Sequence, residues 1–324
     1  MPTYLTNLLN PERFQGHGKT RSYFEGWYFK LVSPSERSLA IIPGIAFDEQ
    51  GSGQAFVQIL DGNRKTSRFL TFPTDVFRAA PDRFLVAVGG SVFSENQITL
   101  NLEGLEGTVQ LINTVGWPKP WYSPGIMGPF SFVPFMECYH GIVSMDHQLE
   151  GQLKLDGELI DFSGGRGYLE KDWGRSFPSA YTWMQSNHFS EPGISLKCSV
   201  ARIPWLGSSF TGFISGLWLR DRLIRFTTYN RSSLRRCSIS ASAVEVTLQN
   251  PDYTLEITAR RDEATTLASP IRGAMDGRIQ ETMNARLEVA LSERKTGSVI
   301  FEGTGLNAGL EVAGEIEKIQ KPSR

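Results

Sequence analysis

The sequence predicts an all-β protein made of antiparallel strands. Apolar and polar side chains alternate along many segments, as in 253–259, where Tyr253, Leu255 and Ile257 fall on one side. Successive side chains of a strand point to opposite faces, so this pattern is typical of half-buried strands. Turn residues separate the alternating segments, and no helical pattern extends over about 11 residues or more. Many short strands of this kind favour a β-sandwich or β-barrel.

The predicted strands cover most of the chain. Residues 243–260 are expected to form a hairpin, because Asn250 and Pro251 mark a turn between two alternating segments. Residues 286–292 alternate again. The other predicted strands are 24–32, 39–47, 55–60, 84–88, 97–102, 108–112, 153–155, 159–162, 182–189, 194–201, 210–219, 222–229, 298–303 and 309–316. Helical turns are expected only at 74–79 and 277–285. The 32 glycines suit the bends and bulges that such strands need.

The length of 324 residues suggests two domains. We place the first β unit at 1–170 and the second at 171–324, although no linker composition marks the boundary. A chain with 40% hydrophobic and 21% charged residues is globular rather than disordered. Its 33 Lys and Arg balance 34 Asp and Glu, which argues against a nucleic-acid-binding protein because such proteins carry a basic face.

The cysteines and the N-terminus predict a cytoplasmic protein. Cys138, Cys198 and Cys237 are odd in number and far apart, so neither a disulfide framework nor a zinc site is expected. The N-terminal residues lack the pattern of a secretory signal. The most apolar stretch, Gly125–Val143, is interrupted by prolines and suits a surface loop or a cavity wall better than a spanning helix. Residues 117–136 are therefore a candidate for peripheral membrane contact.

Two acidic motifs lie among aromatic residues. In 23–29, a strand would place Glu25 on one face with Tyr23, Trp27 and Phe29. An ionisable carboxyl group among three aromatic rings is unusual for a solvated strand. The alternative is that this carboxylate forms an internal salt bridge.

The second motif is GYLEKDWGRSFP at 167–178. As a strand it places Tyr168, Glu170 and Asp172 on one face and Lys171 and Trp173 on the other. If the two carboxyl groups are buried together, at least one pKa must rise. A third segment, WMQSNHF at 183–189, would place Trp183, Gln185 and Asn187 on a common face and His188 on the opposite one.

Four segments resemble the tocopherol cyclase family: FEGWYFK at 24–30, GPFSFVPFMECYHG at 128–141, EKDWGRSFPSAYTWMQSNHF at 170–189 and AGLEVAG at 308–314. The resemblance covers nearly the whole chain in order, and the stretch 128–148 looks closest to a bacterial branch. More distantly, the chain is similar to the carotenoid 1,2-hydratase and AttH group. The resemblance implies two lipocalin-like β-barrel or sandwich units. It also implies an enzyme that closes the chromanol ring of a prenylated hydroquinone.

Ring closure of this kind needs an acid to protonate an alkene, aromatic faces to stabilise the resulting cation, and a base to take the phenolic proton. We expect the acid to be Asp172, Glu170 or Glu25, in that order. Each of them could instead form a salt bridge with Arg166, Arg175 or Lys171. The residues expected to bind substrate are Trp27, Tyr28, Tyr168, Trp173, Trp183, Gln185, Asn187, His188 and His140. The alternative for each aromatic residue is ordinary core packing.

No cofactor or metal is expected. Neither a phosphate-binding loop nor a dinucleotide fingerprint occurs, and the pair Glu137 and His140 lies in a segment that does not read as helix. His147, beside Asp146, is expected in a turn. Two other functions remain open: a lipocalin-like carrier of an apolar lipid, and a hydratase that adds water to the same kind of alkene. In each case the expected partner is an apolar small molecule.

Overall fold

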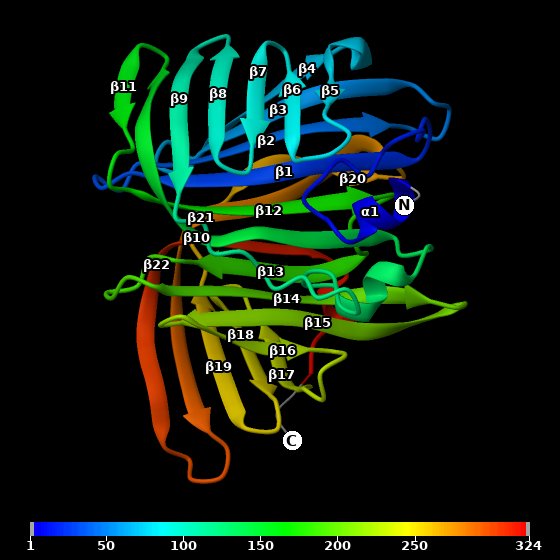
Figure 1. Ribbon diagram of the computed structural model, residues 1–324. Coiled ribbons are helices and arrows are strands. Elements are labelled where there is room, and N and C mark those ends of the chain that lie inside the picture. Colours follow the sequence, from blue (N-terminus) through cyan, green and yellow to red (C-terminus); the bar gives the residue numbers. More distant parts are fainter. Residues whose placement is uncertain (1–2, 322–324) are drawn as a thin grey trace. The chain divides into compact units, whose positions relative to one another are not determined.

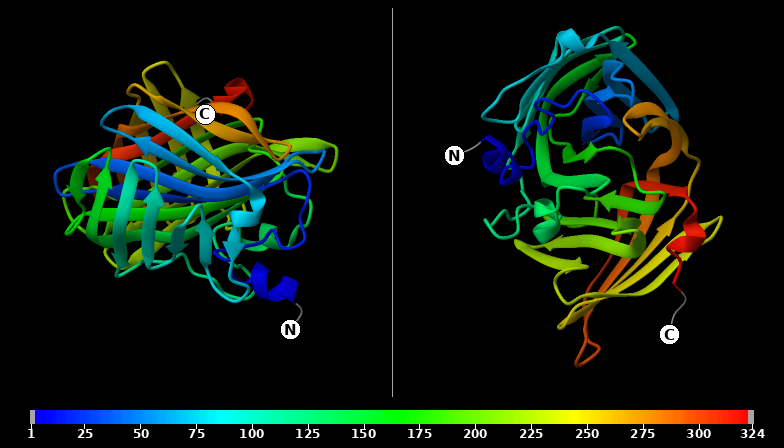
Figure 2. Two further views of the ribbon diagram at one scale, coloured as in Figure 1. Left: turned by 90° about the horizontal axis from the view of Figure 1, so that it is seen from above. Right: turned by 90° about the vertical axis from the view of Figure 1, so that its right-hand side faces the viewer.

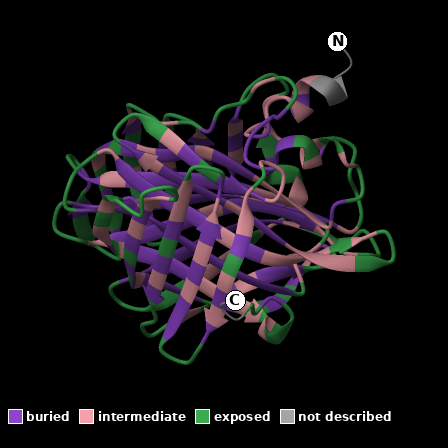
Figure 3. Ribbon diagram, turned by 90° about the horizontal axis from the view of Figure 1, so that it is seen from below, coloured by how far each residue is buried: buried purple, intermediate pink, exposed green. Residues whose placement is uncertain are grey.

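The computed structural model describes residues 3–321, and within them nearly all regular structure is β (Figure 1). The strands form two antiparallel sheets, one of 12 strands and one of 10. This confirms the predicted all-β class. Buried residues run along the strands and exposed ones gather in the turns between them (Figure 3). In the described part of the chain, no helix combines the length and the apolar character needed to cross a membrane.

The first sheet contains β1 (Tyr23–Val32), β2 (Ser38–Phe47), β3 (Gly53–Asp61), β4 (Thr66–Phe72), β5 (Arg78–Ala79), β6 (Leu85–Val88), β7 (Ser91–Ser94), β8 (Gln97–Leu102), β9 (Leu105–Ile112), β10 (Cys138–Leu155), β11 (Glu158–Asp161) and β12 (Arg166–Gly174). Its strand order is β4-β3-β2-β1-β12-β10-β9-β8-β7-β6-β5, with β11 paired to β10. The central strands β1 and β12 are therefore neighbours although about 130 residues separate them along the chain.

The second sheet contains β13 (Ala180–Ser186), β14 (Ile194–Trp205), β15 (Ser208–Leu219), β16 (Arg222–Thr227), β17 (Ser233–Ile239), β18 (Ala243–Gln249), β19 (Tyr253–Arg260), β20 (Thr265–Ile271), β21 (Ala274–Glu293) and β22 (Val299–Gly314). The predicted hairpin at 243–260 corresponds to β18 and β19. Helical segments are short: α1 (Thr3–Leu8), η1 (Thr74–Val76), η2 (Gly128–Phe132) and η3 (Ile316–Lys318). The predicted helical turn at 277–285 is wrong, because these residues belong to the long strand β21.

The chain divides into two compact units. The first contains Met1–Phe177 together with Leu267–Arg278, and the second contains Pro178–Thr266 and Ile279–Arg324. The division therefore falls after β12, whereas the sequence suggested a boundary between residues 170 and 171. A boundary at that point would cut β12 in the middle of its pairing with β1.

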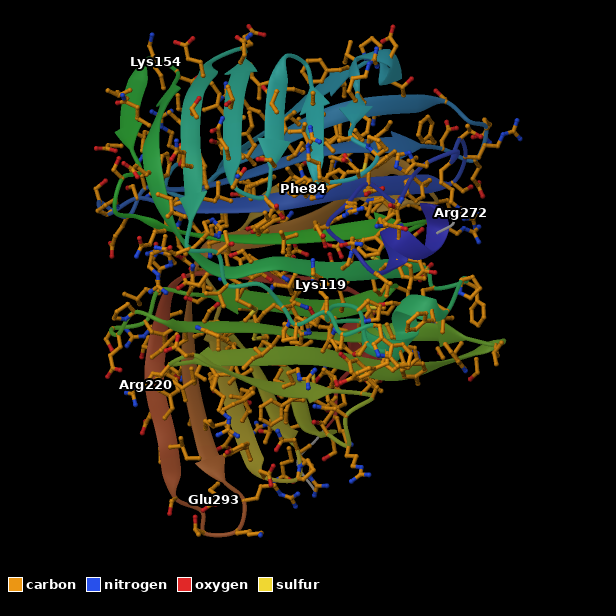
Figure 4. The ribbon with its side chains drawn as sticks, viewed as in Figure 1. Phe84, Lys119, Lys154, Arg220, Arg272 and Glu293 are labelled. Atoms are coloured by element: carbon orange, nitrogen blue, oxygen red, sulfur yellow. The ribbon has the colours of Figure 1, made fainter. Side chains whose placement is uncertain are left out.

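The interior of the first unit is filled by side chains. Its strands, coloured blue to green in Figure 2, curve back on themselves around one apolar cluster. The Trp27 and Phe84 rings stack with centroids 5.4 Å apart, and Phe29 packs between Phe84 and Phe93. Figure 4 labels Phe84 among these enclosed side chains. Trp27, Phe29 and Phe93 are among the largest fully buried side chains of the described residues, so the interior is a packed core.

The second unit has a separate apolar core. Met184, Leu196, Val246 and Leu287 belong to one cluster of buried residues contributed by β13, β14, β18 and β21. Cys198 and Cys237 lie in this cluster as free, buried thiols. Burial raises the pKa of Cys198 to about 11 and that of Cys237 to about 12, so both remain protonated and behave as small apolar residues.

The hairpin formed by the end of β20 and the start of β21 packs on the first unit, although it is inserted in the sequence of the second. The Gln58 side chain makes two hydrogen bonds with the backbone of Ala268. Ala268 N donates to Gln58 Oε1 at 2.9 Å, and Gln58 Nε2 donates to the Ala268 carbonyl at 3.4 Å. At the hairpin tip, Gly273 has φ +88° and donates its N–H to Arg175 O at 2.7 Å. A Cβ there would overlap the backbone of Phe47, so only glycine fits.

A fully buried ion pair joins β1 to β12. Lys171 Nζ lies 2.5 Å from Glu25 Oε1, and both side chains are 0% exposed. Glu25 also accepts the Tyr23 hydroxyl at 2.5 Å and the backbone N–H of Gln15 at 2.9 Å. Burial lowers the pKa of Lys171, and the Glu25 carboxylate opposes that shift.

The same ammonium group fastens the segment that precedes β1. Lys171 Nζ donates to the carbonyls of Pro11 and Arg13, and Trp27 Nε1 donates to Glu12 O at 2.9 Å. The ammonium also lies 4.8 Å from the Trp27 ring centroid and 4.6 Å from that of Trp173, within cation–π range. Every donor site of the buried cation therefore has a partner.

Removal of one partner of this ion pair should destabilise the protein strongly. We expect Lys171→Met to lower the free energy of unfolding by about 3–5 kcal/mol, because it leaves the Glu25 carboxylate buried without its cation. The double variant Lys171→Met/Glu25→Gln should recover part of that loss. Guanidinium unfolding monitored by tryptophan fluorescence measures both effects, with exposed Lys154→Met as the control. Additive losses in the double variant would show that the two residues are not coupled.

His147 is a buried strand residue, so its expected position in a turn is wrong. It lies in β10, is 2% exposed, and its Nδ1 is 3.0 Å from Ser144 Oγ. A Cβ on Gly167 would overlap its ring, which explains the glycine opposite it. Burial, assisted by the positive charge of Arg166, lowers the pKa of His147 to about 3.

This buried neutral imidazole should make stability depend on pH. The unfolded chain binds a proton below the usual histidine pKa of about 6.5 and the folded chain does not, so stability is lost as pH falls from there toward about 3. The slope from this one group is up to about 1.4 kcal/mol per pH unit. Urea unfolding between pH 7.5 and 4.5 should therefore be steeper in pH for the native protein than for His147→Gln. Equal slopes would contradict the assignment.

Candidate functional site

Strand register places a polar group on the outer face of the first sheet, away from its packed interior. Opposite Glu170 on β12 stand Tyr28 of β1 and Ile142 of β10, and opposite Asp172 stand Gly26 of β1 and His140 of β10. Residues opposite one another on paired strands share a face. The predicted face containing Tyr168, Glu170 and Asp172 is thus completed by His140 and Tyr28.

His140 bridges the two carboxylates. Its Nδ1 lies 2.8 Å from Asp172 Oδ1, and its Nε2 lies 3.4 Å from Glu170 Oε2. The side chains of His140 and Glu170 are 10% and 6% exposed, whereas Asp172 is 25% exposed. The imidazole therefore lies between the two carboxylates, within hydrogen-bond distance of Asp172 on one side, while its buried Nε2 makes no hydrogen bond to Glu170 on the other. Asp172 is the member most open to a ligand.

Tyr168 contacts the same oxygen of Glu170 that His140 approaches. The Tyr168 hydroxyl donates to Glu170 Oε2 at 2.5 Å. Burial raises the pKa of Tyr168 well above its usual value, and the neighbouring Glu170 charge raises it further. The phenol therefore stays protonated at every working pH and acts as a permanent donor to the carboxylate.

Apolar side chains surround this polar group on the same face. Phe24, Phe56 and Met275 are buried in one cluster, and Cys138 packs against it. A Cβ on Gly44 would overlap the Phe56 ring, so the glycine leaves room for this ring. Cys138 Sγ is 3.9 Å from Asp172 Oδ1, which places the apolar wall directly beside the acid. Burial raises the pKa of Cys138 well above its usual value, and the negative charges of Asp172 and Glu137 add to this.

Three of the predicted site residues lie on the other face of the same strands. Glu25, Trp27 and Trp173 face inward, where Glu25 and Trp27 contact Lys171 and the Trp173 ring stacks on Tyr139 with centroids 5.5 Å apart. Glu25 already binds an ammonium, a phenol and a backbone N–H, which suits a structural carboxylate rather than a proton donor. For Glu25 the structure favours the salt-bridge alternative, with Lys171 as the partner.

The remaining predicted residues belong to the second unit. Trp183 and Gln185 share one face of β13, opposite Ser199 and Lys197 of β14. The Trp183 ring lies over Gly309, where a Cβ would overlap it. Asn187 is fully buried just after the strand.

His188 forms an isolated bridge with Leu306, with Leu306 N donating to His188 O at 2.8 Å. These four residues, Trp183, Gln185, Asn187 and His188, are not part of the cluster on the first unit, and their predicted role in substrate binding remains a prediction.

One ligand atom each from His140, Glu170 and Asp172 lies within 4.8 Å of the others, which is close enough to hold a cation. The two carboxylates, however, approach different nitrogens of the imidazole. The two ring nitrogens point in diverging directions, so an ion on Nε2 beside Glu170 would leave Asp172 as the group that orients the ring. The arrangement suits a hydrogen-bonded acid set better than a chelate. The pairing of Glu137 with His140 is not part of it.

The apolar residues of this site could not be predicted from the sequence. Phe24 and Phe56 come from strands β1 and β3, and Met275 comes from the inserted hairpin, which only the fold brings together. The pairing of His140 with Asp172 also depends on register, because β10 contains irregularities after Ile142 that no pattern in the sequence reveals. One available signal was the glycine pair Gly26 and Gly44, which face each other on β1 and β2 and leave room for a ring.

The chain was compared with known proteins. A family model described as tocopherol cyclase-like matches residues 105–314. The chain is 26% identical over 235 residues to the chloroplast tocopherol cyclase of Zea mays, which covers 65% of this chain and 49% of the maize protein. It is 22% identical over 365 aligned positions to a protein of Oryza sativa subsp. japonica named "Probable tocopherol cyclase, chloroplastic", covering 92% of this chain and 76% of that one. The chain thus spans about half the length of the maize relative.

Solved structures share the fold. A Nitrosomonas europaea protein whose structure is titled "putative AttH" is 16% identical with a TM-score of 0.53, covering 90% of this chain and 93% of that one. CghA is 10% identical with a TM-score of 0.57, covering 90% and 89%. These likenesses confirm the lipocalin-like β architecture, and the family match over residues 105–314 confirms the resemblance found in the sequence. The chain belongs to the tocopherol cyclase-like family.

Proposed function

We propose that this protein is an acid-catalysed cyclase that converts a prenylated hydroquinone into a chromanol. The observation that carries the proposal is the cluster of Asp172, His140 and Glu170, in which the imidazole lies 2.8 Å from Asp172 and 3.4 Å from Glu170, beside an apolar wall on the outer face of the first sheet. Family membership supports the same reaction class. The maize relative is named as a tocopherol cyclase, and a tocopherol precursor is accordingly the first substrate to test.

In the first proposed step, protonated Asp172 gives its proton to the less substituted carbon of a trisubstituted alkene. The C=C π bond breaks, a C–H bond forms, and a tertiary cation remains. Phe24 and Phe56 lie on the same face as Asp172 and can stabilise that cation through their ring faces. Their apolar wall also excludes water, which would otherwise capture the cation as an alcohol.

In the second step, a hydroquinone oxygen attacks the cation and closes the ring through a new C–O bond. The phenolic proton is then taken up by the set of His140, Glu170 and Asp172. The His140 imidazole has Nδ1 2.8 Å from Asp172 Oδ1, and it is the group that would return the proton to Asp172 and restore the acid. One proton enters the alkene and one leaves the phenol, so the product is an isomer of the substrate and the reaction balances without a cofactor.

A lipocalin-like carrier is less well supported. Carriers of this kind hold their ligand inside the barrel. In the first unit that interior is packed with Trp27, Phe29, Phe84 and Phe93. A hydratase remains chemically close, because it shares the protonation step and differs only in the nucleophile that captures the cation. The product of the same assay distinguishes the two reactions, because a hydratase gives a tertiary alcohol and a cyclase gives a chromanol.

The reaction in heavy water tests the proposal directly. Purified protein incubated with a panel of prenylated hydroquinones in D₂O should give a chromanol with one non-exchangeable deuterium on the newly saturated carbon, measured by mass spectrometry. Asp172→Asn should lower kcat by about 100-fold or more, because the proton donor is lost.

The control for this experiment is Glu150→Gln, an exposed position on the same strand as His140. It should retain full activity. A tertiary alcohol in place of the chromanol would establish the hydratase reaction. Bound substrate that never turns over, or an unchanged rate in Asp172→Asn, would overturn the cyclase proposal.

Cys138 offers a second readout that needs no turnover. Its thiol pKa is raised by burial and by nearby negative charge, so alkylation by N-ethylmaleimide at pH 8 should be slower than that of free cysteine. Asp172→Asn removes one of these charges and should accelerate the reaction, and a bound prenyl hydroquinone should slow it. Peptide mass spectrometry separates Cys138 from Cys198 and Cys237, which are buried. Labelling that is insensitive to Asp172→Asn would contradict the site geometry.

A further inference from the structure

We propose that the connection between β9 and β10 docks this protein on the surface of a lipid bilayer. Four aromatic residues of this connection are exposed, and we call them the aromatic rim: Trp121, Tyr122, Phe132 and Phe135. Their exposed fractions are 77%, 61%, 43% and 55%. Exposed aromatic side chains gathered in one short segment mark a contact surface. The proposal concerns binding alone and does not rest on the cyclase reaction.

The connection is a fixed structure, so the exposure of the rim does not arise from fraying. Ser123–Gly128 are buried, as are Trp117 and Met136. Its backbone folds on itself through turns: Ser123 N donates to Pro120 O at 2.9 Å and the Ser131 hydroxyl donates to Pro124 O at 3.0 Å.

The connection is also attached to the first sheet at both ends. Met145 N donates to Val115 O at 2.7 Å, and the Tyr139 hydroxyl donates to Val133 O at 2.5 Å. The protein therefore presents the rim on an ordered support, which lowers the ordering cost of docking.

The chemistry of the rim favours a bilayer over a protein partner. No Asp, Glu, Lys, Arg or His occurs from 120 to 136, whereas a protein interface surrounds its apolar core with a polar border. Trp121 and Tyr122 pack edge to face with ring centroids 5.7 Å apart. Tryptophan and tyrosine prefer the membrane–water interface, and phenylalanine enters the acyl boundary more deeply.

The cation that is nearest to the aromatic rim in the sequence already forms an ion pair. This pairing predicts how binding of the rim to a bilayer should respond to lipid charge. Lys119, labelled in Figure 4, has its Nζ 2.9 Å from Oε2 of Glu12, on the segment that precedes β1. Docking should therefore depend on insertion of aromatic side chains rather than on attraction to anionic lipids. Vesicles of a zwitterionic phosphatidylcholine should suffice, and added salt should weaken binding little.

The aromatic rim lies close in sequence to the candidate site, so docking on a bilayer would have a functional consequence. The connection ends at Glu137, β10 starts at Cys138, and His140 lies two residues further on. If the proposed function holds, an apolar substrate dissolved in the bilayer would meet the protein next to the strand that holds the acid set. Failure of docking leaves the cyclase proposal standing, because that proposal is tested with soluble substrate.

Vesicle flotation tests the proposal. The native protein should float with phosphatidylcholine vesicles at low and high salt, and the rim variant Trp121→Ser/Tyr122→Ser/Phe132→Ser/Phe135→Ser should bind at least about tenfold more weakly. The matched control replaces four exposed hydrophobic residues outside the rim: Leu159→Ser/Leu206→Ser/Val299→Ser/Ile300→Ser. It should float like the native protein. Circular dichroism and thermal melting confirm that both variants fold.

Three outcomes would overturn the proposal. The first is equal flotation of the native protein and the rim variant. The second is no flotation of the native protein with either zwitterionic or mixed anionic vesicles. The third is a native dimer, seen by light scattering, that the rim variant loses without any vesicle binding, which would assign the rim to a second copy of the chain. Equal loss of flotation in the rim variant and the matched control would also count against a specific surface.

Discussion

The buried ion pair between Glu25 and Lys171 is the constraint on which the first unit depends. Lys171 cannot turn outward without leaving Glu25 uncompensated in the core, and Glu25 cannot turn without releasing Tyr23 and Gln15. The pair thereby fixes which face of β1 and which face of β12 points inward. A slip of one residue would exchange the two faces, so the ion pair specifies register as well as holding the N-terminal segment.

The outward site is a consequence of that register. Because side chains alternate along β12, an inward Lys171 requires an outward Glu170 and an outward Asp172. Pairing with β10 then brings His140 beside Asp172. One short strand thus carries a buried ion pair on its inner face and, on its outer face, the carboxylates to which we assign the proposed proton transfer. Because the two groups lie on different faces of the strand, Asp172 stays partly exposed while the Lys171 ammonium is fully buried.

Much of the fold and of the site could be predicted from the sequence. The features that could not be predicted depend on contacts between residues far apart in the chain. Period-two alternation gave the fold class, most strands, and the division of β12 into a face with Glu170 and Asp172 and a face with Lys171. It placed Glu25 among aromatic rings but could not distinguish a buried acid from a buried ion pair, since that depends on which strand lies beside β1. Leu267–Arg278 belong to the first unit only through long-range contacts, which the sequence likewise does not reveal.

The location of the packed aromatic residues bears on what kind of protein this is. A barrel that carries lipid needs an empty interior, whereas here Trp27, Phe29 and Phe84 occupy it. The outer face, by contrast, combines an acid set with an apolar wall, and the hairpin tied to Gln58 adds Met275 to that wall. The proposed protonation of an alkene needs a site where water is scarce, and the inserted hairpin, which completes an apolar wall beside Asp172, suits that proposal. The placement of apolar surface around Asp172, rather than inside a barrel, favours the proposed chemistry over transport.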